Sequence, residues 1–240
     1  MNLILSIDIG TGGVRTALYD EQLDCKGMQQ AEYSTEYSKP GWAEQTAPEI
    51  YSSCIESINR VLQESKYTGS EISCITLDCS VHTLLGVDGN CHPVTPVLTW
   101  EDSRSDSIVK RWKKEGLSET VYQKTGCPLH PLYAPAKITW WKENNPDLFE
   151  QIKYFITLKS FVLQKITGEL IEEPATTSGS GLINIHKLDW EDEVLELSGI
   201  TRDNVPKLVK PSHIIRGITN QFAGETGLRK DSSVVVGSSD

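Results

Sequence analysis

The sequence lacks the features that would place it on nucleic acid or in a membrane. Its 240 residues carry 23 Lys and Arg against 33 Asp and Glu, a net charge of −10, and no run of basic residues. Because binding to a phosphate backbone needs a basic face, the composition argues against a nucleic-acid partner. No apolar stretch reaches membrane-spanning length, and the start of the chain has no basic segment and cleavage site typical of a signal peptide. We therefore expect no membrane partner.

The cysteines also lack an informative spacing. The chain has 6 of them, with no Cys-x-x-Cys pair and no metal-ligand spacing to a histidine. This pattern predicts reduced thiols in a cytoplasmic protein. Repeats and low-complexity segments are absent as well. With 38% hydrophobic and 23% charged residues, the chain has the composition of a globular protein with a sizeable core.

The most informative stretch that is present runs from residue 4 to residue 20. An apolar run ends at Asp8, glycines follow at positions 10, 12 and 13, and a second alternating run leaves the turn. This pattern predicts a strand, a tight turn and a strand. The N–H groups of such a turn, with Thr11 and Arg15, can hold phosphate, and Asp8 can hold a magnesium ion directly or through water. An ordinary glycine-rich hairpin with a surface aspartate is the alternative.

Strand and helix patterns alternate along the rest of the chain, which predicts a layered α/β fold. A capping box at Thr46 and Glu49 predicts a helix from about residue 47 to 64, and Ser103 and Asp189 are expected to start two further helices. Other expected helices cover 136–143 and 158–166, expected strands cover 72–77, 154–157 and 233–236, and residues 176–181 are expected to form a loop. Domains rarely end just after a core strand, so we expect this chain to be part of a longer protein.

Nine ordered stretches resemble the N-terminal domain of the FGGY carbohydrate kinase family. They are 8–11 with Arg15, 40–45, 81–82, 100–104, 125–126, 137–140, 181–186, 188–190 and 237–240. The resemblance implies an actin-like, ribonuclease-H-like α/β domain over residues 1–240. Its sheet would be mixed and five-stranded, with helices on both faces. It also implies a C-terminal nucleotide-binding domain that this chain does not contain.

The resemblance implies transfer of the γ-phosphoryl group of ATP, with Mg2+, to a hydroxyl of a sugar or sugar acid. Asp240 would be the catalytic base, whereas without the resemblance a C-terminal surface acid is the favoured interpretation of Asp240. Asp8 would be the aspartate that manages magnesium and phosphate. The phosphate loop would be Gly10, Thr11 and Gly12, with Arg15 as the nearby cation.

The resemblance also implies a set of substrate contacts. The candidates are His82, Trp100, Asp102, Arg104, His130 and Tyr133. A neutral imidazole at His82 can hydrogen-bond to sugar hydroxyls, although a structural histidine is the alternative. Trp100 would form an apolar wall under the sugar or belong to the core. Asp102 and Arg104 either contact substrate or pair with each other.

Segments 125–131 and 175–182 are most similar to gluconate kinases, which favours conversion of gluconate to 6-phosphogluconate. A xylulokinase-like activity on a pentulose is the alternative. Glycerol is disfavoured, because Leu132 stands where glycerol kinases carry a substrate-binding tyrosine, and their Arg-Glu pair near His82 is missing. Expected partners are the small sugar or sugar acid and the protein's own C-terminal domain, with a homodimer left open.

Two other classes compete with the enzyme. The chain can be a truncated, non-catalytic sugar-binding remnant, and even as half of a kinase we expect little or no activity from it alone. A chaperone ATPase or a nuclease of ribonuclease-H type would share the fold. A nuclease needs several carboxylates around two metals, but only Asp8 and Asp240 converge in the pattern. The chaperone alternative leaves residues 100–104 unexplained.

Overall fold

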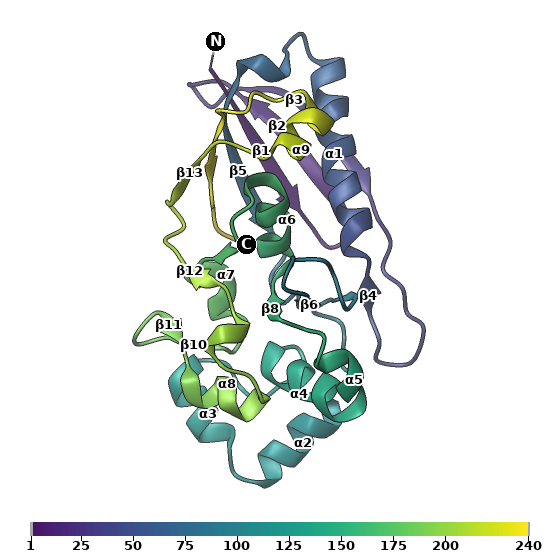
Figure 1. Cartoon of the computed structure of the whole chain (residues 1–240), viewed down its shortest axis with the longest axis vertical. Coiled ribbons are helices and arrows are strands. Elements are labelled where there is room, and N and C mark those ends of the chain that lie inside the picture. Colours follow the sequence, from purple (N-terminus) through teal and green to yellow (C-terminus); the bar gives the residue numbers. More distant parts are fainter. Residues whose placement is uncertain (1, 240) are drawn as a thin grey trace.

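The opening hairpin lies inside a six-stranded mixed sheet (Figure 1), in a computed structural model that describes residues 2–239. In spatial order the strands are β13 (Ile214–Arg216), β14 (Ser233–Val235), β5 (Ile72–Cys79), β1 (Leu3–Ile9), β2 (Gly13–Tyr19) and β3 (Cys25–Glu32). The β1–β5 and β5–β14 pairs are parallel, whereas the others are antiparallel. The predicted class is confirmed, but the sheet has six strands rather than five. The extra strand, β13, is a short apolar segment that pairs with the edge of β14.

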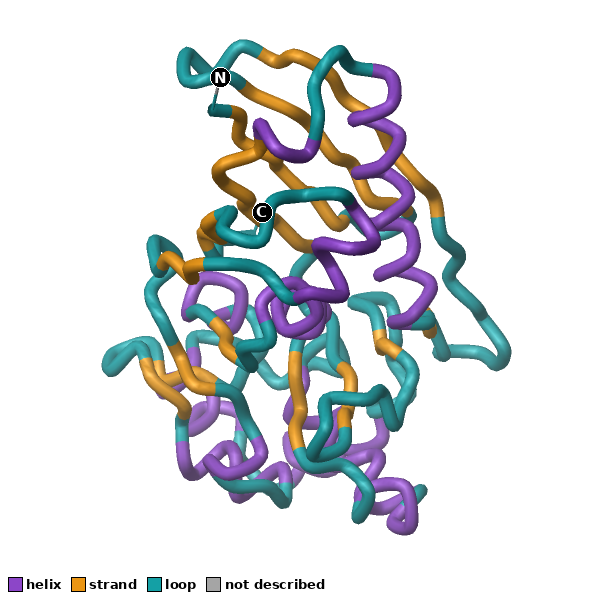
Figure 2. The backbone as a smooth tube through the Cα atoms, turned by 45° about the horizontal axis from the view of Figure 1, so that its top comes forward, coloured by secondary structure: helices purple, strands orange, loops and turns teal. Residues whose placement is uncertain are grey.

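Three helices pack on one face of this sheet: α1 (Ala47–Glu64), α6 (Leu158–Thr167) and α9 (Asn220–Thr226) (Figures 1 and 2). Residues alternate along β1, so that Leu5, Ile7 and Ile9 are fully buried beneath them. Each such side chain contributes about 1.5–3 kcal/mol on burial. The expected helices on the second face are not found among residues 2–239.

Most of the remaining elements form a second half with its own core (Figure 1). Its helices are α2 (Asp106–Lys114), α3 (Ser118–Thr125), α4 (Ala134–Asn144), α5 (Pro146–Phe149), α7 (Pro174–Ser178) and α8 (Asp192–Ser198). Its short strands pair as β4 (Glu44–Gln45) with β7 (Val97–Leu98), β6 (Leu85–Val87) with β8 (Tyr154–Ile156), β9 (Ile171–Glu172) with β12 (Lys207–Leu208), and β10 (Ile183–Asn184) with β11 (Asp189–Trp190). Two 3-10 turns cover Gly69–Glu71 and Arg202–Asn204. Buried Trp112, Trp141 and Trp190 fill this core.

Local signals placed the helices better than they placed their caps. Helix α1 has the predicted bounds, but the Thr46 side chain makes no capping hydrogen bond, and a proline stands in the first turn instead. The prediction that Ser103 caps the next helix is wrong, because the cap position is Ser105. The helix expected from Asp189 begins three residues later, since Asp189 pairs in a strand.

Residues 176–181 were expected to form a loop, but the first three of them belong to helix α7. Glu173 stands at the cap position, and its carboxylate accepts hydrogen bonds from the backbone N–H groups of Ala175 and Thr176. Proline follows it in the first turn. These two bonds and the proline fix the start of this short helix.

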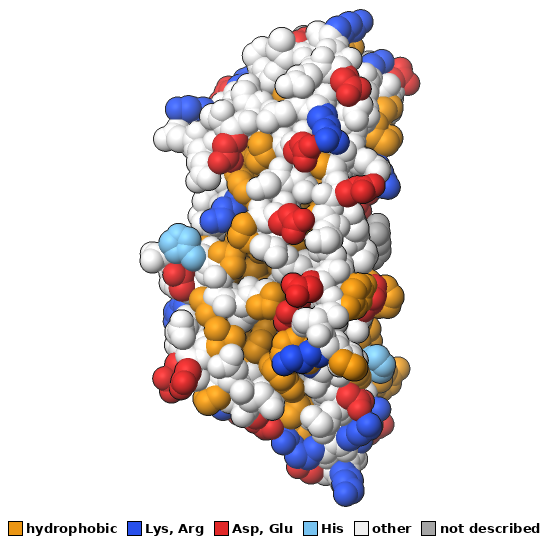
Figure 3. All heavy atoms as spheres, turned by 90° about the vertical axis from the view of Figure 1, so that its right-hand side faces the viewer, with side chains coloured by type: hydrophobic (Ala, Val, Ile, Leu, Met, Phe, Trp, Pro, Cys, Tyr) orange, Lys and Arg blue, Asp and Glu red, His pale blue; other side chains and the backbone are white. Residues whose placement is uncertain are grey.

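The surface shows mixed charge. On the face drawn in Figure 3, Lys and Arg side chains are scattered among Asp and Glu, and they form no continuous basic area there. Among residues 2–239, no helix has both the length and the apolar character needed to cross a bilayer.

Candidate functional site

The glycine turn between β1 and β2 lines a hollow of about 270 Å³ together with Asp8 and Arg15. Asp8 and Arg15 are cross-strand partners, and Arg15 Nη1 lies 2.7 Å from Asp8 Oδ2. Both side chains stay accessible, with 34% of Asp8 and 55% of Arg15 exposed. Five predicted site residues are therefore brought together: Asp8, Gly10, Thr11, Gly12 and Arg15. The hollow offers a carboxylate, a guanidinium and turn backbone to a charged ligand.

Two side chains from elsewhere fix the carbonyl groups of this turn. Gln45, on β4, donates from Nε2 to the Thr11 carbonyl over 2.7 Å, and the Tyr33 hydroxyl donates to the Gly10 carbonyl. Burial raises the pKa of Tyr33 far above its usual value, so it remains a neutral donor. Neither residue was predicted as part of the site. The only signal for Gln45 was its place in the 40–45 stretch.

Of the three glycines of the turn, only Gly13 is needed for space, and none is needed for an unusual dihedral angle. None of Gly10, Gly12 and Gly13 has a positive φ. A Cβ at Gly13 would lie 2.8 Å from the Ala31 carbonyl oxygen, whereas a Cβ at Gly12 would meet nothing within 4 Å. Gly13 thus serves the close pairing with β3, and Gly12 leaves its surface open towards solvent.

A second carboxylate, Asp78, lies beside Asp8. The two residues are register partners at the ends of the parallel strands β1 and β5, so their side chains point to the same face. Asp78 Oδ1 accepts a hydrogen bond of 2.8 Å from the Cys79 N–H. Asp78 was not predicted as a site residue. Its signal was available, because, like Asp8, it is an aspartate that follows the apolar part of a buried strand.

The residues present fit a magnesium ion that arrives with a phosphate ligand. Magnesium is usually bound by one or two carboxylates, with water and substrate phosphate completing its octahedron. Asp8 and Asp78 supply two carboxylates on one face of the sheet. Within residues 2–239 no cluster of three or more His, Cys, Asp or Glu side chains is arranged to hold a metal by itself.

Three predicted substrate residues form an aromatic cluster beyond the end of β5. The His82 and Tyr133 rings lie 5.6 Å apart and the His130 and Tyr133 rings 6.4 Å apart, both edge to face. His82 has a φ of 61°, and its Nδ1 lies 2.7 Å from the Gly179 carbonyl oxygen. Because a carbonyl only accepts, Nδ1 carries the proton. Burial lowers the pKa of His82, so the ring is neutral at pH 7 and Nε2 is an acceptor.

The other three predicted substrate residues lie on the loop after β7. Trp100 is 49% exposed, so it is not a core residue. Asp102 and Arg104 form a two-pronged ion pair, and Arg104 Nη2 also lies 2.6 Å from Glu44 Oε1. The Asp102 and Arg104 side chains are almost fully buried. This geometry matches the alternative in which they pair with each other.

Asp240, the predicted base, lies outside the described residues. The segment leading to it passes against the end of β5. Gly237 has a φ of 74°, its N–H donates to the Pro211 carbonyl over 3.0 Å, and an added Cβ would lie 2.1 Å from the Leu77 carbonyl oxygen. Only glycine fits this close approach.

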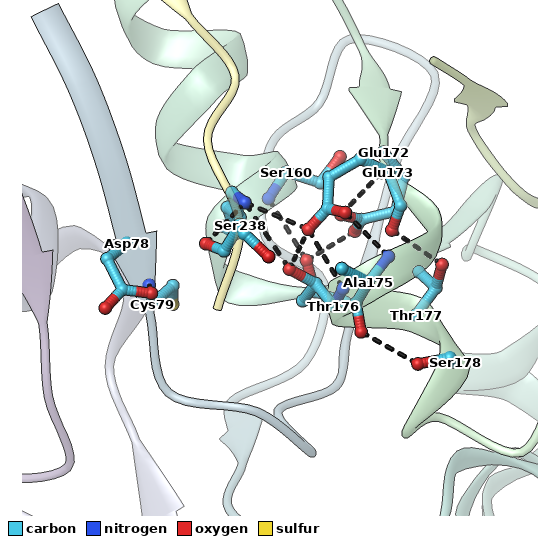
Figure 4. A network of polar contacts seen from close by, with 12 residues as sticks. Asp78, Cys79, Ser160, Glu172, Glu173, Ala175, Thr176, Thr177, Ser178 and Ser238 are labelled. Atoms are coloured by element: carbon cyan, nitrogen blue, oxygen red, sulfur yellow. Dashed lines mark hydrogen bonds and ion pairs between the residues drawn. The ribbon is translucent and has the colours of Figure 1, made fainter. Parts of the chain in front are cut away.

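A buried polar network next to this segment was missed by the sequence analysis (Figure 4). Lys159 Nζ lies 3.0 Å from Glu173 Oε1 and 2.7 Å from the Ser238 carbonyl oxygen. Glu172 is also buried, and its carboxylate accepts hydrogen bonds from the Thr157 hydroxyl and the Glu173 N–H. No local pattern marks the bond from Lys159 to Ser238, because the two residues are 79 positions apart in the sequence.

Two solved structures that share this architecture are carbohydrate kinases. The chain matches gluconate kinase from Lactobacillus acidophilus with a TM-score of 0.94 at 27% identity, covering 100% of this chain and 48% of that one. A ligand-bound xylulose kinase from the same organism gives the same TM-score, identity and coverage. The fold and the site thus define the class as the actin-like domain of a carbohydrate kinase.

The chain belongs to the FGGY family of carbohydrate kinases, because the model of that family's N-terminal domain matches residues 3–240. Among curated relatives, gluconokinase of Bacillus subtilis is 29% identical over 237 residues, 99% of this chain and 46% of the relative. Glycerol kinase of Thermococcus onnurineus is 30% identical over 222 residues, 91% of this chain and 45% of the relative. The chain therefore spans about half the length of the curated relatives it matches.

Proposed function

We propose that this chain is the sugar-binding, base-carrying half of a kinase that converts gluconate to 6-phosphogluconate with ATP. The observation that carries the proposal is the juxtaposition at the ends of β1 and β5. There a glycine turn with Asp8 and Arg15 adjoins Asp78, and β5 leads within a few residues to His82. The glycine turn with its charged neighbours can bind phosphate, and His82 can bind sugar hydroxyls.

In this proposal the turn and Arg15 receive the phosphates of ATP, and His82 Nε2 accepts a hydrogen bond from a sugar hydroxyl. Asp240 accepts the proton of the attacking hydroxyl. In a loose transition state that proton becomes acidic late, so the position of Asp240 matters more than its basicity. Magnesium, held by Asp8 with Asp78 beside it, supplies charge neutralisation at the phosphates when bound.

Gluconate is favoured over other sugars by the similarity of segments 125–131 and 175–182 to gluconate kinases. The match to the Bacillus subtilis gluconokinase supports this choice. Xylulose is the second candidate, because the xylulose kinase structure matches the fold equally well. Since the relatives are about twice as long, we also propose that the remaining half holds the adenosine. This chain alone would then bind sugar weakly and turn over no ATP.

A substrate panel tests the proposal. The chain with its C-terminal continuation is assayed for ADP formation with gluconate, xylulose, ribulose and glycerol, and we expect gluconate to give the highest kcat/KM. Phosphorylation of glycerol but not gluconate would overturn the substrate assignment. ATP turnover by the 240-residue chain alone would contradict the proposed need for a second half.

The base assignment is tested by Asp240→Asn, which should abolish turnover while sugar binding, measured by calorimetry, changes little. Asp231→Asn is the matched control. Asp231 is an exposed aspartate near the same end of the chain, and it pairs only with Arg229 among the contacts found. Survival of activity in Asp240→Asn would show that another group accepts the proton.

A further inference from the structure

Lys159 is a lysine with every donor used and no exposure to solvent. It lies on α6 and is fully buried, as is Glu173. Its ammonium group has three N–H donors, and three acceptors surround it: the Ser238 carbonyl at 2.7 Å, Glu173 Oε1 at 3.0 Å and Thr176 Oγ1 at 3.4 Å. A buried charge is costly unless it is paired and hydrogen-bonded, so this arrangement tolerates little movement of any partner.

The partners of Lys159 come from two other parts of the chain, so that the lysine joins three separate segments. Glu173 and Thr176 belong to the cap and first turn of α7, and Ser238 belongs to the segment after β14 (Figure 4). Lys159 and Ser238 are 79 residues apart in sequence. Lysine is long enough to bridge α6 to this segment, and its charge strengthens the bond to the carbonyl oxygen.

Ser238 lies two residues before Asp240. On its other side, the N–H groups of Val236 and Gly237 donate to the carbonyls of His213 and Pro211 over 3.1 and 3.0 Å. The segment is therefore held by backbone bonds on the β13 side and by Lys159 on the α6 side. Lys159 is the bond nearest in sequence to Asp240 among those described.

We propose that Lys159 is a positioning residue for the catalytic base: its bond to the Ser238 carbonyl sets the path of the chain into Asp240. This inference rests on the proposed role of Asp240. Glu173 neutralises the lysine and at the same time caps α7, whose C-terminal end continues into Gly179, the partner of His82. The Lys159–Glu173 ion pair thus fixes the position of the segment before Asp240 relative to the loop whose Gly179 orients His82.

The variant that isolates the bond to Ser238 is Lys159→Met combined with Glu173→Gln. Glutamine keeps an acceptor oxygen for the α7 cap and leaves no unpaired charge, so the double variant is designed to fold where Lys159→Met alone can fail. Lys137→Met is the matched control, because Lys137 is also a fully buried lysine, but its acceptor is the Thr99 carbonyl in the other core.

Amide hydrogen exchange on the 240-residue chain gives the first readout. In the double variant, exchange at Val236 and Gly237 relative to β1 amides should rise roughly tenfold or more, as expected for loss of a charge-assisted hydrogen bond. The ratio should stay within about twofold in Lys137→Met, because that variant leaves the segment's own bonds intact. An unchanged ratio in the double variant would overturn the proposal.

Kinetics of the chain with its C-terminal continuation give the second readout. The double variant should lower kcat roughly tenfold or more, because the segment before the base loses its bond to Lys159. The KM for sugar should change less than about threefold, because glutamine at position 173 keeps an acceptor oxygen for the cap of α7, the helix that leads to Gly179. An increase in the KM for sugar as large as the decrease in kcat would contradict a positioning role. If Asp240→Asn retains activity, the assignment of Asp240 as the base fails, and the exchange ratio still reports separately whether Lys159 holds the segment.

Discussion

The two halves of the molecule each enclose one fully buried lysine, and the two lysines are stabilised differently. Lys159, by the sheet core, has a carboxylate, a hydroxyl and a carbonyl as acceptors. Lys137, in the helical half, donates to the Thr99 carbonyl over 2.6 Å. Burial lowers the pKa of Lys137 to about 8, although the charge of Asp102 opposes the shift. The first lysine has a direct counterion, and the second does not.

The difference shows what each lysine is suited for. A buried lysine in contact with a carboxylate holds its neighbours in fixed positions, because an unpaired buried charge is costly, and this suits the segment before a catalytic base. A buried lysine whose acceptor is a neutral carbonyl has a proton that is more easily lost. The bond from Lys137 fixes Thr99, the residue between β7 and Trp100. The free-energy cost of burying the charge of Lys137 falls as pH rises, because the ammonium group then loses its proton.

The largest effect on stability should come from removing only one partner of the Lys159–Glu173 ion pair. Lys159→Met leaves Glu173 charged and buried without its partner, and we expect a loss of about 3–5 kcal/mol in the free energy of unfolding. Urea titration at pH 7 measures it. Lys137→Met should cost about 1 kcal/mol or less, because the loss of one hydrogen bond is offset by removal of a buried charge. Equal losses would mean that the counterion makes no difference.

The next effect is a pH dependence at Glu172, on strand β9, whose Ile171 packs in the sheet core. Burial raises the pKa of Glu172 from 4.5 to about 7. The folded state therefore holds this proton more tightly than the unfolded state, and the stability that this provides is lost as pH rises from 4.5 through 7. We expect a loss of roughly 2–3 kcal/mol across this window, absent in Glu172→Gln. Parallel urea curves for the two proteins at pH 5 and pH 7.5 would refute the shift.

The helical half should respond to pH with the opposite sign. The folded pKa of Lys137 lies near 8 and its unfolded pKa near 10.5, so the folded state releases this proton first. Stability should rise by about 2 kcal/mol between pH 8 and pH 10 relative to Lys137→Met, which has no such group. Thermal melts over this range measure the difference. A constant difference between the two proteins would show that the burial penalty is absent.

How much of this was predictable depended on whether the signal was local. The bounds of α1 followed from apolar residues at helical spacing, and the Asp8 turn followed from one strand, three glycines and a second strand. The failed caps show the limit even of local rules. The hydroxyl of Thr46 at the cap position predicts a capping hydrogen bond. The structure has no such bond, and a proline in the first turn starts the helix instead.

Contacts between distant segments were beyond sequence reasoning. Nothing near Lys159 in the sequence indicates that α6 packs against the segment after β14, and so neither Lys159 nor Glu173 was identified. Asp102 and Arg104 were left with two alternatives, because only packing shows that Glu44 completes their pairing. Exposure of Trp100 was equally undetermined, since a tryptophan suits both a core and a sugar-binding wall.

The smallest effect on stability should come from Gly12 in the glycine turn. Substitutions of Gly12 and Gly13 separate the role of this turn in folding from its role in phosphate binding. Gly13→Ala brings a Cβ to 2.8 Å from the Ala31 carbonyl and should cost about 1–3 kcal/mol, whereas Gly12→Ala meets nothing and should change stability by less than about 0.5 kcal/mol. If the open side of Gly12 is where phosphate approaches, Gly12→Ala should nevertheless raise the KM for ATP several-fold in the chain with its continuation. Urea titration and steady-state kinetics on the two variants measure both quantities. A Gly12→Ala protein with an unchanged KM for ATP would move the phosphate away from this turn and leave Asp8 and Arg15 as a plain cross-strand ion pair.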